Sequence, residues 1–147
     1  MSSDDARHRT KVYLETYLLN ANLTEDDDST TVKFIVAYAF PDYPWLRVFQ
    51  DKNVSLVFGV GTPETEPLPV GVGYIEKVPV TVWCINKAGI SGTKLRWKAE
   101  AELRRICETY PAGGSLFTWQ RLGDNEKNLG STVLYSVEYV MRYKRYS

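Results

Sequence analysis

The glycine-containing turn at Gly89–Lys94 is a candidate phosphate-binding loop, because it stands between a predicted strand and a predicted helix. A nucleotide-binding P-loop needs four residues between its glycines and a lysine directly after the second glycine. Here two residues separate the glycines, and Thr93 precedes Lys94. We therefore favour a strand-to-helix turn capped by Ser91 or Thr93. An anion held by free N–H groups of the helix is the alternative.

Histidine and cysteine are too scarce to build the common metal sites and catalytic triads. The chain has one histidine, His8, and two cysteines, Cys84 and Cys107, far apart in the sequence. A cysteine nucleophile needs a base, and zinc sites need several Cys or His ligands. We expect His8 to be solvated and both cysteines to be reduced, buried thiols, which indicates synthesis in a cytoplasm. No catalytic residue, cofactor or metal is predicted.

Two groups of carboxylates are the remaining candidates for acid–base or metal chemistry. Glu64, Glu66 and Glu76 lie near a proline-rich stretch, and Asp26–Asp28 form a triplet. The triplet lacks the alternating spacing and the distal glutamate of a calcium loop. We therefore interpret it as a solvated loop. The segment Arg142–Tyr146 interleaves basic and aromatic residues, as single-stranded nucleic-acid sites do, but a solvated C-terminus is favoured.

Composition is that of one ordinary globular domain of 147 residues, with 18 basic and 18 acidic side chains. That balance gives no global attraction to nucleic acid or to an anionic membrane. Aromatic residues make up 13% of the chain, including 10 tyrosines and 4 tryptophans. Antiparallel strands favour these residues, and so do protein interfaces; the strand explanation is preferred. No apolar run is long enough to span a membrane.

The order of predicted elements is that of an α+β fold, with an antiparallel sheet packed against one long amphipathic helix and an N-terminal helix. The predicted helices cover 4–20 and 93–110. The predicted strands cover 32–40, 45–50, 54–60, 74–86, 115–122 and 131–146, with a hairpin turn at 51–53 and a polar turn at 123–130. The stretch 61–73 is predicted to be a long loop or an irregular hairpin arm, because prolines lack the N–H that a strand ladder needs. Pro79 predicts an edge or a bulge.

The helix at 93–110 is the most strongly patterned segment. Leu95, Ala99, Leu103, Ile106 and Tyr110 recur at steps of three and four, which places them on one stripe facing the core. Opposite charges stand four residues apart on the other face, in the pairs Arg96–Glu100, Glu100–Arg104 and Arg104–Glu108. We expect that face to be solvated.

The final strand is longer than a sheet of this size usually needs. Val133, Tyr135, Val137, Tyr139, Met141 and Tyr143 alternate with polar residues. Its end either projects and pairs with another subunit, or the strand bends or stops near Val140 and leaves a basic tail. The pattern does not choose between these two possibilities.

The element order resembles that of tail-terminator and tail-completion proteins of tailed viruses. The resemblance covers a strand at Val78–Ile85, the glycine-containing turn, the helix Thr93–Tyr110, and two strands ending in Tyr139–Tyr143. The N-terminal helix followed by strands, with Trp45–Phe49 after a proline-containing turn, is similar too. The likeness is one of order over most of the chain, and no family residue is carried over.

The resemblance implies a small non-enzymatic domain that closes into a ring, commonly a hexamer, at the upper end of the tail tube. There it would stop tube growth and join the tail to the neck, leaving a lumen for DNA. It implies a virion protein made in the host cytoplasm. Its partners would be copies of itself, tail-tube proteins and neck proteins, with transient DNA contact and no membrane.

Projecting segments are the candidates for ring contacts. The residues named for subunit contacts are Pro63, Pro67, Tyr74, Tyr139, Met141, Tyr143 and Tyr146. Asp26, Asp27 and Asp28 are candidates for the lumen, where an acidic loop would repel DNA and let it slide. The alternative hypothesis is a small-ligand or nucleic-acid binding module that uses the 61–73 loop beside the 89–94 turn.

Overall fold

A computed structural model describes residues 3–39, 45–51, 53–71, 73–110, 117–129 and 132–146. Its helices are α1 (Ser3–Tyr17), α2 (Trp45–Asp51) and α3 (Gly92–Thr109), with short 3-10 turns η1 (Asn20–Asn22) and η2 (Pro69–Gly71). Its strands are β1 (Phe34–Tyr38), β2 (Leu56–Val60), β3 (Glu64–Pro67), β4 (Gly73–Ile85), β5 (Phe117–Leu129) and β6 (Thr132–Tyr146).

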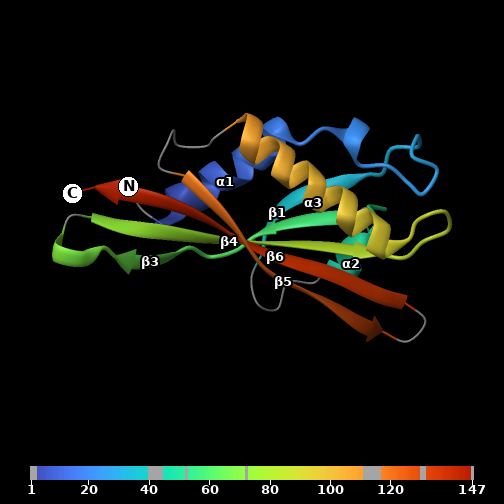
Figure 1. Cartoon of the computed structure of the whole chain (residues 1–147). Helices are drawn as coiled ribbons and strands as arrows, with labels where there is room; N and C mark the ends of the chain where they lie inside the picture. The colour runs from blue at the N-terminus through green and yellow to red at the C-terminus, as the bar shows by residue number, and fades with distance from the viewer. Residues whose placement is uncertain are drawn as a thin grey trace.

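The described strands form one sheet in the order β1-β2-β4-β6-β5, with β3 pairing with β4. Only β1 and β2 run parallel; the other pairs are antiparallel. Helices α1 and α3 lie together on one face of this sheet (Figure 1). The α+β prediction, with a long amphipathic helix on a mainly antiparallel sheet and a helix near the N-terminus, is confirmed.

The core lies between this sheet face and the two helices. Leu95, Ala99, Leu103 and Ile106 of α3 are buried, as their spacing predicts. Tyr110 differs: it is 39% exposed and stacks on Tyr17 with ring centroids 4.2 Å apart. None of the described helices is long and apolar enough to cross a membrane.

The predicted solvated face of α3 is only partly solvated. Arg104 and Glu108 are exposed, but Arg96 is buried and the Glu100 carboxylate accepts a 2.7 Å hydrogen bond from the Tyr139 hydroxyl. Arg121 of β5 forms an ion pair with the same carboxylate. The prediction was wrong here because β5 and β6 continue alongside the helix, and their polar side chains reach the near half of its charged face.

The segment 45–50 is helix α2 and not a strand, so the predicted hairpin with 54–60 does not form. Its Val48 and Phe49 pack against Val54 and Val57 on the sheet face opposite α1 and α3. Parallel neighbours such as β1 and β2 cannot be joined by a tight turn and need a crossover connection, which contains α2. The aromatic and β-branched residues that suggested a strand instead form the apolar contacts between this helix and the sheet.

Strand β5 continues through the predicted polar turn at 123–130 and ends at Leu129. Its register against β6 shifts between Arg121 and Gly123, which marks a bulge. The prediction failed because β5 is an outer strand, where polar side chains can face solvent without ending the strand. Part of the earlier predicted strand, at 115–116, lies outside the described residues.

Strand β6 runs to Tyr146 without stopping near Val140. It pairs with β4 along its length, from Leu134 opposite Ile85 to Tyr146 opposite Gly73, and with β5 as far as Tyr143. Pro79 of β4 lies where β2 ends and β3 begins, and Gly61 donates its N–H to the Pro79 carbonyl. Proline has no N–H to donate, and Pro79 lies at the break between β2 and β3, where neither strand pairs with it. This explains how an inner strand such as β4 accommodates a proline.

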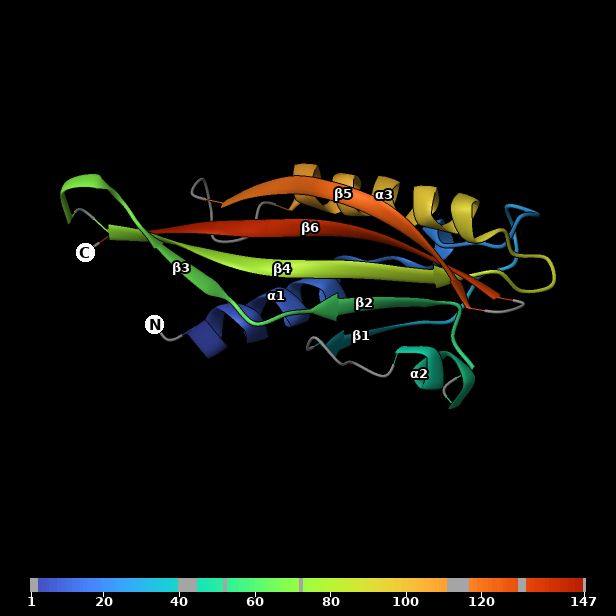
Figure 2. The ribbon, with the colours of Figure 1, turned by 90° about the horizontal axis from the view of Figure 1, so that it is seen from below.

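The 61–73 stretch is a hairpin arm, one of its two predicted forms. Strand β3 pairs antiparallel with the first part of β4, with Glu64 opposite Lys77 and Pro67 opposite Tyr74. This arm, together with the end of β6, extends beyond the helices α1 and α3 in both views (Figures 1 and 2). We call residues 64–77 with 142–146 the arm.

Candidate functional site: the uncovered sheet face and its arm

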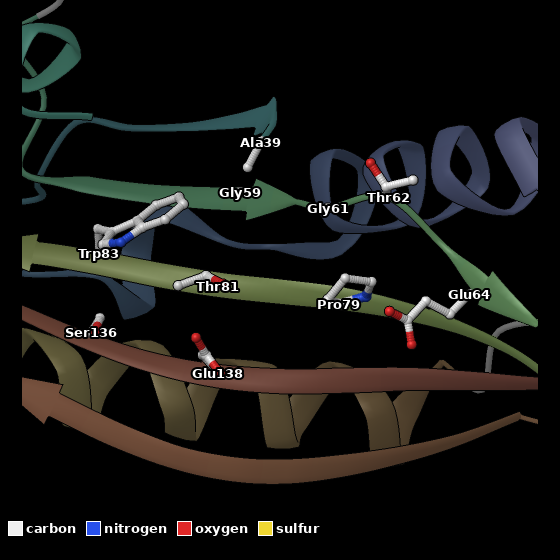
Figure 3. Close-up of a pocket in the computed structure, with 10 residues that line it drawn as sticks. All are labelled: Ala39, Gly59, Gly61, Thr62, Glu64, Pro79, Thr81, Trp83, Ser136 and Glu138. Carbon is white, nitrogen blue, oxygen red and sulfur yellow. The ribbon is translucent and has the colours of Figure 1, made fainter. Parts of the chain in front are cut away.

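The face of the sheet that α1 and α3 leave uncovered carries a groove of about 440 Å³ (Figure 3). Strands β2, β4 and β6 and the connection from β2 to β3 supply its walls. It is lined by Ala39, Gly59, Gly61, Thr62, Glu64, Pro79, Thr81, Trp83, Ser136 and Glu138. A hollow of this size is within the range of ligand pockets.

Two glycines, Gly59 of β2 and Gly61 just after that strand, leave room for the rings at the base of the groove. A Cβ on Gly59 would lie 2.3 Å from Cζ3 of Trp83 and 2.8 Å from the Ala39 Cβ. A Cβ on Gly61 would lie 2.7 Å from Cγ of Pro79. The indole and the pyrrolidine ring therefore approach the β2 backbone closely, and only glycine leaves room for them. The neighbouring residues Phe58 and Val60 point to the other face and are fully buried.

The groove combines these two apolar rings with hydroxyl groups and two carboxylates. Thr62, Thr81 and Ser136 supply the hydroxyls. Glu64 and Glu138 are exposed, and neither has a hydrogen bond or ion pair with another side chain among the described residues. The groove is therefore negatively charged and has a partly apolar floor.

Within the arm beside the groove, strand β3 is the exposed part, whereas Glu76 and Tyr143 are buried. All four residues of β3 are exposed, including the interface candidate Pro67, and Tyr74 is half-buried. Lys77 forms an ion pair with Glu66, and Arg142 donates a 3.3 Å hydrogen bond to the Gln120 side chain. Few side chains of the arm reach the core. Its position is therefore set mainly by the backbone pairing of β3 with β4 and of β4 with β6.

Four of the proposed contact residues do not lie on exposed surface. Tyr139, Met141 and Tyr143 are at most 6% exposed and belong to the chain's own core, and Pro63 is buried. The Tyr143 hydroxyl lies 3.1 Å from the Thr10 hydroxyl. Tyr139, Met141 and Tyr143 alternate onto the helix-covered face of β6, so these three side chains stabilise the fold and are not available to a neighbour. The side chain of Tyr146 lies outside the described part of the chain.

Each carboxylate of the acidic triplet Asp26–Asp28 has a hydrogen-bond or ion-pair partner within the chain. The backbone N–H of Ser91 donates to both carboxylate oxygens of Asp26, at 3.0 and 3.1 Å. Hydrogen bonds from the Thr30 side chain and backbone and from the Ser29 backbone lower the pKa of Asp27 to about 2. Asp28 forms a 2.7 Å ion pair with Lys98.

The same region has three of the N–H groups that could bind an anion at the 89–94 turn already occupied by the chain's own side chains. Asp26 occupies the N–H of Ser91, the Asn86 side chain accepts from the N–H of Gly92 at 2.7 Å, and the Ser91 hydroxyl accepts from Lys94. Ser91 is the N-cap of α3. Gly92 is required for packing, since a Cβ there would lie 2.2 Å from Cδ2 of Tyr135.

The alternative ligand site predicted from the 61–73 loop beside the 89–94 turn is not assembled. Strand β4, with 13 residues, separates the two segments. A strand of that length spans roughly 40 Å, so the segments lie at opposite ends of the sheet. Figure 1 shows β3 at one end and the turn before α3 at the other. That prediction was wrong because the sequence does not show which loops share an end of a sheet.

The single histidine and the two cysteines lie apart from the groove, whereas the candidate carboxylate Glu64 lines it. Burial raises the pKa of Cys84 far above its usual range and that of Cys107 to about 11. His8 is exposed, and its Nδ1 lies 2.8 Å from the Tyr38 hydroxyl. Within the described ranges, no group of three His, Cys, Asp or Glu side chains is placed to hold a metal ion.

Comparison with known proteins does not assign the chain to a family. No protein-family model matches the chain, and no curated protein matches it.

Proposed function

We propose that this chain is a structural subunit that assembles with copies of itself into a closed ring. In this proposal the ring ends the tail tube of a tailed virus and joins the tail to the neck. The arm is the observation that carries the proposal, since it extends the sheet beyond the helices that cover it.

Strand β3 of the arm contributes little to the stability of a single copy. Stability from burial scales with the apolar area removed from water, and every residue of β3 is exposed. An exposed strand edge also presents unpaired N–H and C=O groups that another chain can cover. The arm is thus an element whose surface becomes useful when a second chain lies against it, with Pro67 and Tyr74 as its contact candidates.

The other edges favour a head-to-tail arrangement over a symmetric pair. The outer strands of the sheet are β1 and β5, which differ in length and in polarity. Strand β5 carries exposed charges and a bulge, two features that protect an edge from direct strand pairing. Contact between unlike surfaces is heterologous, and it forms a ring when the rotation closes.

The place of the ring in a virus rests on the resemblance in element order. Helix α1, strand β4, helix α3 and the final two strands keep that order, whereas Trp45–Phe49 is helical instead of a strand. Tail-tube and neck proteins would meet the two flat sides of the ring, and DNA would pass through the middle. The acidic loop is retained as a lumen candidate; Asp27 is exposed, and its low pKa keeps it ionised.

Mass in solution tests the ring. The full chain is measured by light scattering and native mass spectrometry across a concentration series, and assembled particles are imaged by electron microscopy. We expect a discrete species of several copies with a central opening. The paired variant Pro67→Ser, Tyr74→Ser should lower its amount, and Glu108→Gln on the outer face of α3 should not. A chain that stays monomeric at every concentration would overturn the proposal.

A further inference from the structure

We propose that the groove on the uncovered sheet face binds an arginine side chain of another protein, with the guanidinium group between the Glu138 carboxylate and the Trp83 ring. The lining residues include two carboxylates and no basic side chain, so the groove favours a cation. The inference goes beyond the ring proposal and does not depend on it, because every residue of the site belongs to one copy of the chain.

Glu138 is an exposed carboxylate whose neighbours on the adjacent strands carry no charge. Thr81 lies opposite it on β4, and Gly123 lies opposite it on β5, where the missing side chain leaves no partner. Arg142 is on the same face of β6, but its Cα lies roughly 13 Å away, and its side chain donates to Gln120. Among the described residues Glu138 forms no hydrogen bond or ion pair through its side chain. Its carboxylate is therefore left for a cation from outside the chain.

The space over Thr81 lies between this carboxylate and an indole ring. A Cβ on Gly59 would lie 2.3 Å from Cζ3 of Trp83, so the ring lies over the backbone of β2. Figure 3 shows Trp83 turned toward β2 and Glu138 on β6, with Thr81 of β4 between them. A cation over Thr81 would thus have the carboxylate on one side and the indole on the other. Within about 6 Å of the ring centroid, a cation is attracted by the indole.

A guanidinium group uses these neighbours more completely than an ammonium group does. Its planar fork can donate two N–H groups to one carboxylate, and its flat face can stack on an indole. The Thr81 and Ser136 hydroxyls line the groove beside Glu138 and can accept from its remaining N–H groups. An ammonium group is strongly hydrated and has no flat face. The site therefore favours arginine over lysine.

The size and openness of the groove favour a side chain on a polypeptide over a small free cation. Glu138 is exposed, and an exposed ion pair alone contributes little to affinity. The groove, of about 440 Å³, is also much larger than one guanidinium group and is lined further along by Pro79 and Thr62. Residues on either side of the arginine in an extended segment can cover that surface, as peptides do in aromatic-lined grooves.

Capped hexapeptides of alanine with one varied central residue test the site on the whole chain. Heteronuclear NMR follows the backbone amides of Thr81, Ser136 and Glu138 during each titration. We expect the arginine peptide to bind at least about threefold more tightly than the lysine peptide, because only the guanidinium group pairs and stacks at once. The citrulline peptide keeps the shape without the charge and should bind at least about tenfold more weakly than the arginine peptide. N-acetyl-arginine amide should also bind more weakly, since it lacks the flanking residues.

Two matched variants connect this binding to one carboxylate. Glu138→Gln should weaken binding of the arginine peptide at least about threefold, because it removes the charge that pairs with the guanidinium group. Glu126→Gln removes the same charge at an exposed residue opposite Tyr135, on the other face of the sheet, and should bind like the wild type. Both positions are exposed, so thermal unfolding of the two variants should match that of the wild type.

The inference is overturned if the arginine peptide shifts none of the three amides, if the citrulline peptide binds as tightly, or if Glu138→Gln binds like the wild type. A lysine peptide that binds as tightly as the arginine peptide would make this a site for any cation and reject the guanidinium assignment. N-acetyl-arginine amide binding as tightly as the peptide would reject the polypeptide ligand. These titrations do not measure self-association, so the ring proposal is tested separately by mass in solution.

Discussion

The even-numbered and odd-numbered side chains of β4 lie on the two faces of the sheet and have different surroundings. Val78, Val80, Val82 and Cys84 are fully buried beneath α1 and α3. Pro79, Thr81 and Trp83 are only partly buried, and they line a groove. One strand therefore supplies the core of the fold with one set of residues and an accessible surface with the other. The difference separates the residues that hold the fold from those available for contact.

The largest effect on stability is expected from the helix-covered face. Phe58 is fully buried and meets Phe34 edge to face, with ring centroids 5.7 Å apart. Phe58→Ala should lower the free energy of unfolding by about 3–5 kcal/mol, because it removes apolar contacts and leaves a cavity. Urea unfolding measures this. A loss no larger than that of Thr81→Ala, on the other face, would contradict the assignment of the core to the helix-covered face.

A smaller effect is expected where the uncovered face is tightly packed. Gly59→Ala should destabilise the fold by about 1–3 kcal/mol, since its methyl group would collide with the Trp83 ring. Replacing Trp83 by leucine in the same chain should recover part of that loss. Chemical unfolding of the two single variants and the double variant gives the coupling energy. Strictly additive effects would show that the ring and the glycine do not meet.

A buried carboxylate on the helix side should make stability depend on pH. Burial alone would raise the pKa of Glu102, but hydrogen bonds from Arg105, the Leu19 N–H and Asn22 outweigh it and lower that pKa. Its contribution is therefore present above the unfolded pKa, near 4.5, and is lost as pH falls through the lower folded value. Glu102→Gln should lose about 1–3 kcal/mol at pH 7.

The pH profile of unfolding identifies this contribution. The difference in stability between wild type and Glu102→Gln should shrink as the pH falls below 4.5. Glu108→Gln, on the exposed side of the same helix, serves as the matched control and should leave the profile unchanged. A constant difference across the acid range would contradict the role assigned to the Glu102 carboxylate.

The smallest effect on stability is expected from polar residues of the groove. Ser136→Ala and Glu138→Gln should each change the free energy of unfolding by no more than about 0.5 kcal/mol, because both residues keep contact with solvent. The same urea titrations measure this. A loss of 2 kcal/mol or more, as an order of magnitude, would mean that the groove belongs to the folding core.

Local periodicity was sufficient for the features that depend on one segment. The stripe from Leu95 to Ile106 predicted the buried face of α3, and the alternation along β6 predicted one face of that strand. The same alternation was misread at Tyr139 and Met141, which were assigned to a subunit contact. A strand whose apolar face alternates with polar residues buries that apolar face within its own domain.

The features that the sequence did not reveal depend on distant neighbours. Nothing in residues 45–50 shows that β1 and β2 lie parallel and need a crossover. Nothing in 123–129 shows that this polar stretch pairs with β6 at the edge of the sheet. The groove had one local signal: Gly59 and Gly61 alternate with buried Phe58 and Val60 in a strand. That pattern indicates close approach of other groups on one face.

The most direct test of the arm as the assembly surface compares Tyr74 with Trp97. Tyr74 lies in the arm, opposite Pro67, and Trp97 is 59% exposed on the outer face of α3. Hydroxyl-radical footprinting of dilute and assembled protein measures the solvent access of both side chains. We predict that assembly protects Tyr74 and leaves Trp97 unchanged. Protection of Trp97 with no change at Tyr74 would place the contact on the helices and contradict the proposal.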